Sequence, residues 1–535
     1  MKNQRTLLIL ILISFTSLSC LSFAQSTQRK HPAQWNNLVK GGRFMDRFQT
    51  MPQGIQSDHC WGDKAVAHRF VNNGIEDTIH SFWGGNILKD KQGLYHMMLC
   101  GWLENSTKGH MSWPKSSVYH AICNNPIGPF VLKDSVGKGH NPEIFKLKNG
   151  GYATYYINGY YFANSLNGPW QKKQFSFDPR DRKIIEGLSN LTFTHRQDSS
   201  VLMICRGGGT WISKTGTSTY YQISDQRAYP AVEGRFEDPC VWRDHVQYNM
   251  IVNDWYGRIA YYLRSLDGVH WITDPGEAYQ PGIARHPDGS KEGWFKYERI
   301  KIRQDKYGRA IQANFAVIDT IKWNDLSNDN HSSKNISIPL NPGLLLSILT
   351  PLHFSPKTKE ITVRVKAEPG FDPSKNLDLK SLRLGLSGEV NFGRGGQVLS
   401  TKVENKDLII TFDAIDNRIT KKTFALKLLG HKNNGDLIFG YCRLPWVNDT
   451  PALVSARAPI MTSEGMKIKL ENFGLTTCGK IAVQLIRQEK DKREIISSLK
   501  IDSIPPYGNK IVTIPFDQCK NIPTGTYSAQ TINIE

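Results

Sequence analysis

The stretches His140-Asn141-Pro142-Glu143-Ile144-Phe145 and Phe236-Glu237-Asp238-Pro239-Cys240-Val241 follow one plan, in which a polar or acidic head is followed by apolar residues. Three further stretches repeat this plan: WGGNI at 83–87, LSNL at 188–191 and ERI at 298–300. With Asn86, Asn141, Asn190, Asp238 and Arg299 as markers, successive copies are 55, 49, 48 and 61 residues apart. Most copies are followed by a turn and a second apolar strand, such as NGG at 149–151 before YATYYI.

A period near 50 residues with several short strands in each unit is typical of a β-propeller. Five copies predict five blades, and the innermost strand of each blade would line one axial cavity. The heads of the copies would then converge although they are far apart in sequence. We therefore expect an all-β protein, with a five-bladed β-propeller followed by two β-sandwich (immunoglobulin-like) domains.

The expected domain boundaries follow changes in residue composition and hydrophobic pattern along the chain. A polar, turn-rich stretch (NDLSNDNHSSKN) predicts a linker, and alternating apolar and polar residues beyond it predict sandwich strands. The expected segments are a signal peptide at 1–24, a lead-in at 25–54, the propeller at 55–323, the linker at 324–335, a sandwich at 336–447 and a smaller sandwich at 452–535.

The first 24 residues have the organisation of a secretory signal. Lys2 and Arg5 precede an apolar run at 7–15, and small residues at Ser22 and Ala24 suit cleavage after Ala24. Cys20 offers a lipoprotein alternative, but the residues before it form a poor lipobox. We expect a secreted or periplasmic protein without a transmembrane segment, because no other stretch is long and apolar enough to span a bilayer.

Cysteine spacing and net charge limit the cofactors and partners that we expect. No CxxC pair occurs among the eight cysteines left after cleavage, so we expect no metal and no other cofactor. Cys478 and Cys519 are candidates for a disulfide. The net charge of +19, or +17 without Lys2 and Arg5, favours a polyanionic partner. The sequence has no recognisable nucleic-acid-binding module, so an anionic oligosaccharide or polysaccharide is the expected substrate, unless the charge is a general surface property.

Residues at or beside the heads are the candidate site. An acid, a base or an imidazole is available for catalysis at six of them: His80, His140, Glu143, Glu237, Asp238 and Glu298. Substrate binding is expected from aromatic, amide and guanidinium groups: Trp83, Asn86, Trp102, Trp113, Asn141, Asn190, Arg206, Arg235 and Arg299. Adjacent strand residues point to opposite faces, so only one of Glu237 and Asp238 is expected to face the cavity, with Asp238 favoured by analogy with Asn141.

A family resemblance rests on the order HNPEIF, NGG, YATYYI, then FEDPCVW with HVQYNMIVND, then SLDGVHW. This order resembles the five-bladed propellers of glycoside hydrolase family 43, over roughly residues 55–320 and about half of the chain. The resemblance implies a base aspartate on the first blade, a pKa-modulating aspartate on a middle blade and an acid glutamate further on. This chain has Asn86 and Asn141 at the first two positions, and only Glu237-Asp238-Pro239 keeps an acid at such a head.

Three functions fit these residues. Hydrolysis of a glycosidic bond needs one carboxylic acid and one carboxylate, and it is the preferred interpretation. Elimination on a uronyl unit of an ulvan-like polymer, by a lyase or dehydratase, needs a His or Tyr base and an Arg or Lys clamp. A glycan-binding propeller without activity is the third. The sequence does not specify the sugar or its linkage.

Overall fold

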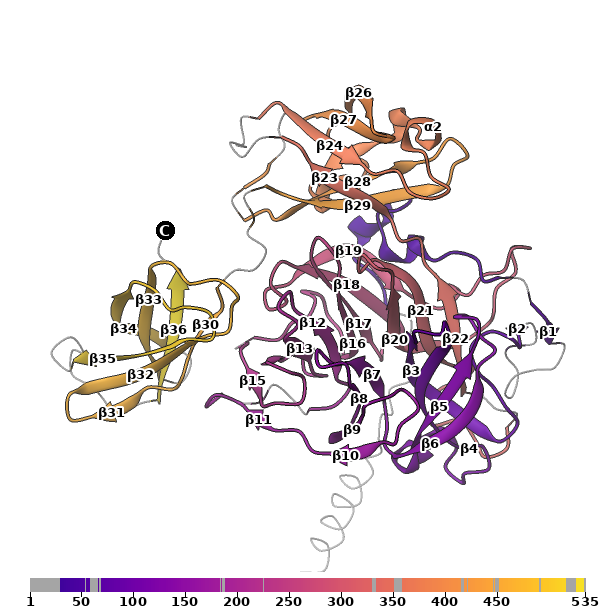
Figure 1. Ribbon diagram of the computed structural model, residues 1–535, viewed down its shortest axis with the longest axis horizontal. Helices are drawn as coiled ribbons and strands as arrows, with labels where there is room; N and C mark the ends of the chain where they lie inside the picture. The colour runs from indigo at the N-terminus through magenta and orange to yellow at the C-terminus, as the bar shows by residue number, and fades with distance from the viewer. Residues whose placement is uncertain are drawn as a thin grey trace, which may run out of the picture.

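The computed structural model describes residues 29–52, 54–57, 66, 69–182, 184, 188–224, 226–329, 333–350, 358–414, 418–420, 422–445, 447, 452–489, 492–515 and 526–533. Within these residues the regular secondary structure is nearly all β-strand (Figure 1). The expected signal peptide and Cys519 lie outside them. No helix in the described ranges has both the length and the apolar character needed to cross a bilayer.

Five small sheets follow one another along the described part of the chain, and within each the successive strands pair antiparallel. The first contains β3 (His80–Lys89), β4 (Tyr95–Leu103), β5 (Ser117–Cys123) and β6 (Val131–Lys138). The second contains β7 (Glu143–Lys146), β8 (Tyr152–Tyr156), β9 (Gly159–Ala163) and β10 (Gln171–Lys173). The third contains β12 (Thr192–His195), β13 (Val201–Ile204), β14 (Thr210–Ser213) and β15 (Tyr220–Gln222), with β11 (Phe177–Asp178) parallel to β15.

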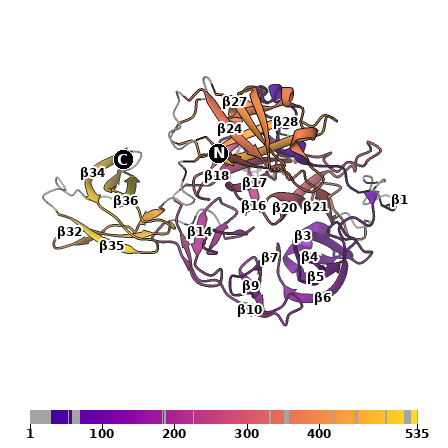
Figure 2. The same cartoon turned by 45° about the horizontal axis from the view of Figure 1, so that its top comes forward.

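The fourth and fifth sheets complete the set. The fourth contains β16 (Phe236–Arg243), β17 (Tyr248–Asp254), β18 (Ile259–Ser265) and β19 (Ile272–Tyr279), and the fifth contains β20 (Lys296–Gln304), β21 (Ala310–Ile318) and β22 (Ser333–Pro339). The first strand of each sheet contacts the first strand of the next, and β20 contacts β3. The five first strands therefore form a closed ring (Figure 2).

One backbone conformation recurs at the same place in all five sheets. The left-handed φ values are 52° at Gly84, 53° at Asn141, 50° at Asn190, 53° at Asp238 and 53° at Arg299. Left-handed residues other than glycine are uncommon, and Asn and Asp tolerate this conformation best. The repeat found in the sequence is thus present in the structure, with one correction. Its first member is Gly84 and not Asn86, because the Gly84-Gly85 pair adopts the turn.

In the first four sheets, the residue two positions after the left-handed residue links its sheet to the next one. In each link a backbone N–H donates to a side chain of the preceding sheet: Ile144 to Asn86 Oδ1 at 2.7 Å, Phe193 to Glu143 Oε1 at 2.9 Å, and Val241 to Thr192 Oγ1 at 3.1 Å. A backbone hydrogen bond of Ile302 to Cys240 continues the series. Asn86 is therefore a link between sheets, and the ring is held by polar bonds as well as by apolar packing.

Strand β22 begins inside the stretch that the sequence predicted as a linker. It pairs with β21 along its whole length, from Ser333 opposite Ile318 to Pro339 opposite Gln312. Its polar residues are buried and have hydrogen-bond partners. Lys334 bonds to Glu76 at 2.6 Å, and Asn335 donates to the carbonyl of Gly84 at 3.1 Å. Composition predicted a solvated linker because it cannot show that these polar groups have buried partners.

A second all-β part follows, with strands in the spatial order β25-β28-β29-β23-β24-β27-β26. Its elements are β23 (Leu344–Ile348), β24 (Glu360–Val365), α2 (Pro373–Asn376), η4 (Leu379–Ser381), β25 (Arg383–Gly385), α3 (Ser387–Val390), β26 (Val398–Glu404), β27 (Asp407–Asp413), β28 (Ala425–His431) and β29 (Leu437–Arg443). Alternate residues of β24 and β27, among them Val363 and Ile410, are buried in one apolar core. The period-2 pattern of the sequence is thus that of strands with one buried face.

The last part has two small sheets around a separate core. One sheet contains β30 (Val454–Ala456), β31 (Ile460–Thr462), β32 (Gly465–Asn472) and β35 (Asn509–Pro515), and the other β33 (Ile481–Glu489), β34 (Lys492–Ile501) and β36 (Thr526–Asn533). Ile468 of the first sheet and Val483 of the second are buried in the same cluster. Arg196 donates to the carbonyl of Phe473 at 2.7 Å, so this part also contacts the third sheet of the ring.

The N-terminal segment joins the ring to the second part. Its short elements are η1 (Ala33–Asn37), η2 (Phe44–Arg47), β1 (Gln56–Ser57) and β2 (Arg69–Phe70), and a further 3₁₀ helix, η3 (Gly109–Lys115), follows β4. The guanidinium of Arg47 lies 4.5 Å from the ring of Phe44, 5.0 Å from Tyr262 of β18 and 4.1 Å from Phe439 of β29. It also donates to the hydroxyl of Tyr441 at 3.2 Å.

Replacing Arg47 should loosen this junction. We expect Arg47→Ala to lower the free energy of unfolding by about 2–4 kcal/mol, because desolvated cation–π contacts and a charge-assisted hydrogen bond are lost together. Arg47→Lys should recover less than half, since lysine lacks the planar group that stacks on rings. Chemical denaturation measures the change. Lys40→Ala, on an exposed side chain of the same segment, is the control and should have little effect.

Candidate active site

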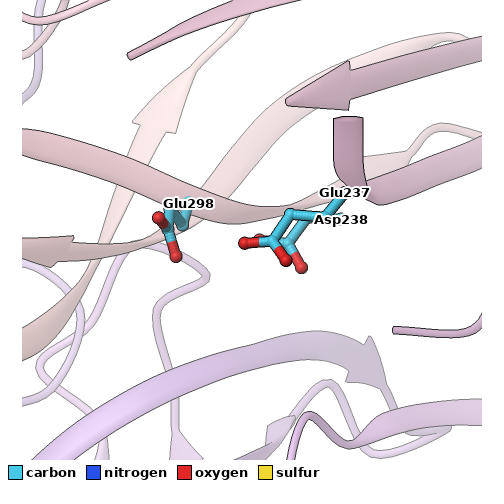
Figure 3. A group of neighbouring side chains, drawn as sticks. All are labelled: Glu237, Asp238 and Glu298. Carbon is cyan, nitrogen blue, oxygen red and sulfur yellow. The ribbon is translucent and has the colours of Figure 1, made fainter. Parts of the chain in front are cut away.

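Three carboxyl groups meet at the inner strands of the fourth and fifth sheets. Glu237 and Asp238 lie on β16 and Glu298 lies on β20, and oxygens of the three lie within 4.8 Å of one another (Figure 3). Asp238 and Glu298 are buried, with 2% and 1% of their side chains exposed, whereas Glu237 keeps 14%. Glu237 is therefore the carboxyl group of the three that solvent reaches most easily.

Glu237 and Asp238 both face Glu298, which corrects the expectation that only one of them would face the site. The alternation of a regular strand is broken here. Asp238 has a left-handed φ of 53°, and the pairing of β16 with β17 shifts between Glu237 and Cys240. Such a bulge re-aims side chains and allows neighbours to share one side. A matching shift between Glu298 and Lys301 occurs on β20.

Four cationic side chains surround the cluster. Lys296 Nζ lies 2.6 Å from Glu298 Oε1, and Lys322 bonds the other oxygen of Glu298. The remaining two are arginines from different sheets: Arg299 Nη1 lies 3.0 Å from Asp238 Oδ1, and Arg206 Nε lies 3.7 Å from Glu237 Oε2. Arg206 is the more exposed of the two, with 39% of its side chain accessible.

This arrangement shifts the pKa values of Glu237 and Glu298 in opposite directions. Burial and the charges of Asp238 and Glu298 raise the pKa of Glu237 to about 7, against the opposing effect of Lys322 and Arg206. Burial also acts to raise the pKa of Glu298, but Lys296 and Lys322 outweigh it and the pKa is lowered. For Lys322, Glu298 and Glu237 outweigh burial and raise its pKa. One carboxylic acid thus lies beside a carboxylate, which is the pairing that acid–base catalysis uses.

The raised pKa of Glu237 has a consequence for stability. The folded protein holds this proton more tightly than the unfolded chain, whose glutamate titrates near 4.5, so stability should fall as the pH rises through about 7. Glu237→Gln cannot lose a proton. We expect its melting temperature, relative to that of the unchanged protein, to rise between about pH 5 and pH 8. A constant difference across this range would contradict the raised pKa.

The left-handed residues form a polar network at the axis. Asn141 Nδ2 donates to Asn190 Oδ1 at 2.7 Å, and Arg299 Nη2 donates to the Asn141 carbonyl at 3.4 Å. Arg299 also lies against Gly84 and is 1% exposed. Three residues expected to bind substrate, Asn141, Asn190 and Arg299, are thus brought together. The side chains of Asn141 and Asn190 bond to each other, and that of Arg299 bonds to Asp238 and to the Asn141 carbonyl.

Glu143 has a similar role in the scaffold. One of its oxygens accepts the N–H of Phe193 in the third sheet, and the other bonds to Lys301 of the fifth sheet. The side chains of Glu143 and Lys301 are 6% and 3% exposed. Sequence reasoning selected Glu143 as an acid or base at a head. In the structure it stands two residues beyond the head, at the position that links sheets.

Replacing Glu143 should therefore affect stability first. Glu143→Gln leaves the buried ammonium of Lys301 without its counter-charge, and breaking such a pair costs about 3–5 kcal/mol. The double variant Glu143→Gln with Lys301→Met should recover part of the loss, because it removes both charges. Denaturation curves of the two variants test this. Equal stability of Glu143→Gln and the unchanged protein would show that the pair contributes nothing.

The two candidate histidines are in different settings. His140 immediately precedes Asn141, the position that Glu237 and Glu298 hold in their sheets. Its Nδ1 is 3.0 Å from Ser116 Oγ, and burial, followed by the charges of Arg299 and Lys322, lowers its pKa well below the usual value, so it is neutral. His80, at the start of β3, is bonded to Asp77 at 2.9 Å and stacks on Phe82.

The remaining candidates divide by exposure. Trp83 and Trp102 are buried in one cluster, 2% and 4% exposed, and Lys322 lies 4.9 Å from the ring of Trp83. Trp113 is partly exposed and lies 4.7 Å from His140, so of Trp102 and Trp113 only Trp113 is accessible. Arg235 is exposed and lies over the ring of Tyr256 at 5.1 Å.

Sequence reasoning missed Lys296, Lys322 and Trp323. Lys296 lies two residues before the head Glu298, so an extended repeat comparison would have included it. Lys322 and Trp323 lie in the turn after β21, outside every repeated phrase. Trp255 is one of many aromatic residues of the repeats, and such residues are ordinary core in most cases.

The carboxyl cluster also bears on metal binding. Among the described residues, Glu237, Asp238 and Glu298 are the one group of potential ligands close enough to share an ion. Four cationic side chains already face these carboxyl groups, and they would repel a cation. The donor set therefore fits proton transfer better than metal coordination.

Comparisons with known proteins found similar structures and no related sequence. No protein-family model matches the sequence, and no curated protein matches it. Similar structures include a family 117 glycoside hydrolase from Zobellia galactanivorans (12% identity, 54% of this chain and 90% of that chain, TM-score 0.36) and an alpha-L-arabinofuranosidase from Lactobacillus brevis (9%, 50% and 92%, 0.35).

A third similar structure is a glycoside hydrolase family 43 arabinoxylan arabinofuranohydrolase from Bacillus subtilis (10% identity, 85% of this chain and 95% of that chain, TM-score 0.36). The glycoside hydrolase family named from the sequence motifs is thus among the similar structures. Sequence identity to these three structures is 12%, 9% and 10%, so the residues of this site, and not the similarity, indicate the function.

Proposed function

We propose that this protein is a secreted glycoside hydrolase-like enzyme that cleaves glycosidic bonds of anionic oligosaccharides. The observation that carries the proposal is the set of three carboxyl groups within 4.8 Å, in which Glu237 has a pKa of about 7 and Glu298 is held ionised by two lysines. Hydrolysis needs these two protonation states side by side.

Each carboxyl group has a role in this proposal. Glu237 donates its proton to the glycosidic oxygen, because it is the most accessible of the three and is protonated near neutral pH. After burial, the charge of Asp238 contributes most to the raised pKa of Glu237. Glu298 acts as the carboxylate, either on water or on the sugar itself. A spacing within 4.8 Å is nearer to the roughly 5–5.5 Å of retaining enzymes than to the roughly 6.5–9.5 Å of inverting ones.

The architecture in this proposal is a five-bladed β-propeller followed by two β-sandwich domains. The closed ring of five first strands supports the propeller, and the second and third parts with their own apolar cores support the sandwiches. Secretion is supported by the signal-like segment at 1–24. The net charge of +17 after its removal favours an anionic polymer as the source of the substrate.

Elimination on a uronyl unit is the second candidate, and His140 is the observation that favours it. Its imidazole is neutral and can accept a proton, and it stands at the repeat position that Glu237 and Glu298 occupy in their sheets. The nearby cationic groups would stabilise the carboxylate of a uronate. A glycan-binding protein without turnover remains the third possibility and predicts binding alone.

The central test is replacement of the proposed acid. We expect Glu237→Gln to lower kcat by about 10²–10⁴, because a general acid contributes that much. The activity of the unchanged enzyme should fall as the pH rises above about 7, as Glu237 loses its proton. Glu233→Gln is a matched control, since that glutamate is four residues away and 91% exposed. Normal turnover by Glu237→Gln would exclude it as the acid.

The products distinguish the reactions. Hydrolysis adds the mass of one water for each bond cleaved. Lyase action cleaves without adding mass and creates a double bond that absorbs in the ultraviolet, and dehydration removes one water from an intact oligosaccharide. If His140→Ala abolishes turnover and Glu237→Gln does not, elimination is the reaction.

A further inference from the structure

Two tryptophans flank the carboxyl cluster. Trp323 is 38% exposed, more than any other Trp, Tyr or Phe among the described residues. Its ring centroid lies 6.5 Å from that of Trp255, with the planes at 86°. Exposing a large apolar ring to water is unfavourable, so a wall of two such rings indicates a surface that a ligand covers.

The backbone places this wall beside the proposed acid. Trp255 follows β17 and stands two residues beyond Asn253, the cross-strand partner of Glu237. Trp323 follows β21 and is adjacent to Lys322, which bonds Glu298. The wall is thus built from the fourth and fifth sheets, the two that also supply the carboxyl groups.

Lys296 contacts both the tryptophan wall and the carboxyl cluster. Lys296 Nζ lies 5.3 Å from the ring of Trp255 and 2.6 Å from Glu298 Oε1. Lys296 thus joins the tryptophan wall to the carboxyl cluster, so a sugar ring on the wall would lie beside that cluster.

The charge at this place favours an anion. When Glu237 holds its proton, four cationic side chains face two carboxylates, which leaves an excess of two positive charges. Arg235 adds a fifth cation. It lies beside the wall, because its backbone carbonyl accepts the N–H of Trp255. Among the described residues, no carboxylate pairs with its exposed guanidinium. A neutral sugar would leave this excess uncompensated in a partly desolvated site.

We propose that Trp255, Trp323, Lys322 and Arg235 form a subsite for a sugar unit that carries a carboxylate or a sulfate ester. The apolar face of the sugar stacks on Trp323, the exposed ring, while Trp255, whose plane is nearly perpendicular, borders the edge of the sugar. Its anionic group lies between Lys322 and Arg235. Arginine suits such a group, since its fork matches both oxyanions. The inference rests on the proposed function for the position of the cleaved bond, and the binding itself does not depend on turnover.

Binding to the Glu237→Gln protein tests the subsite without cleavage. Calorimetric titrations would use three probes of equal length: oligogalacturonate for the carboxylate, a carrageenan oligosaccharide for the sulfate and a cello-oligosaccharide as the neutral probe. We expect Trp323→Ala to weaken binding of an anionic probe about 10- to 100-fold, the range found for buried aromatic contacts, and Trp323→Phe to recover most of it.

The cationic part is tested by Arg235→Ala and its matched control Arg285→Ala, an exposed arginine that donates to the carbonyl of Gly282. Arg235→Ala should weaken anionic probes about 10-fold or more and leave the neutral probe unchanged. The carboxylate and sulfate probes distinguish the two sources of the anion. Equal losses for neutral and anionic probes would overturn the anionic assignment, and unchanged binding by Trp323→Ala would overturn the subsite.

The two proposals fail in different ways. If Trp323→Ala binds normally while Glu237→Gln loses turnover, the subsite is wrong and the hydrolase proposal stands. If the probes bind through Trp323 and no product forms from any of them, the subsite stands and the enzymatic proposal is wrong. Circular dichroism of each variant shows whether a loss reflects the site or the fold.

Discussion

The structure depends on one backbone constraint, a left-handed residue on the inner strand of each of the five sheets or two residues before it. At Asp238 and Arg299 this conformation is accompanied by a bulge that turns two successive side chains toward the axis. Without it, Glu237 and Asp238 would lie on opposite faces of β16, and the three carboxyl groups could not meet. In the first four sheets the position two residues later links the sheet to the next. In the fourth sheet, for example, the candidates Glu237 and Asp238 and the link residue Cys240 are neighbours in sequence.

This proximity explains which parts of the site could be predicted. The repeated phrases predicted the five sheets and identified Glu237, Asp238 and Glu298, because polar heads before apolar strands are visible in the sequence. The phrases could not separate a residue that faces the site from one that links two sheets. Glu143 and Asn86 were selected for that reason, although each bonds to the backbone of the next sheet. The first copy was also shifted by two residues, since Gly84 carries no side chain to mark the turn.

Other features have no local sequence pattern. The contact of Lys322 with Glu298 joins residues 24 positions apart. It forms only after β20 and β21 have paired and the turn after β21 is in place. The same holds for Trp323, which looks like the beginning of a polar linker until Trp255 is placed beside it. Predicting charge pairs and aromatic walls of this kind requires the tertiary fold, because the interaction depends on burial and on distance and not on residue type alone.

Strand β22 has a consequence for how the ring remains closed. It contacts β3 as well as pairing with β21, and its Asn335 bonds the carbonyl of the left-handed Gly84, while Lys334 bonds Glu76 just before the first sheet. The last strand of the fifth sheet therefore joins the two ends of a circle made from one linear chain. A polypeptide that stopped at residue 323 would contain all three carboxyl groups but lack this clasp. The fifth sheet, which carries Glu298 together with Lys296 and Lys322, could then separate from the first.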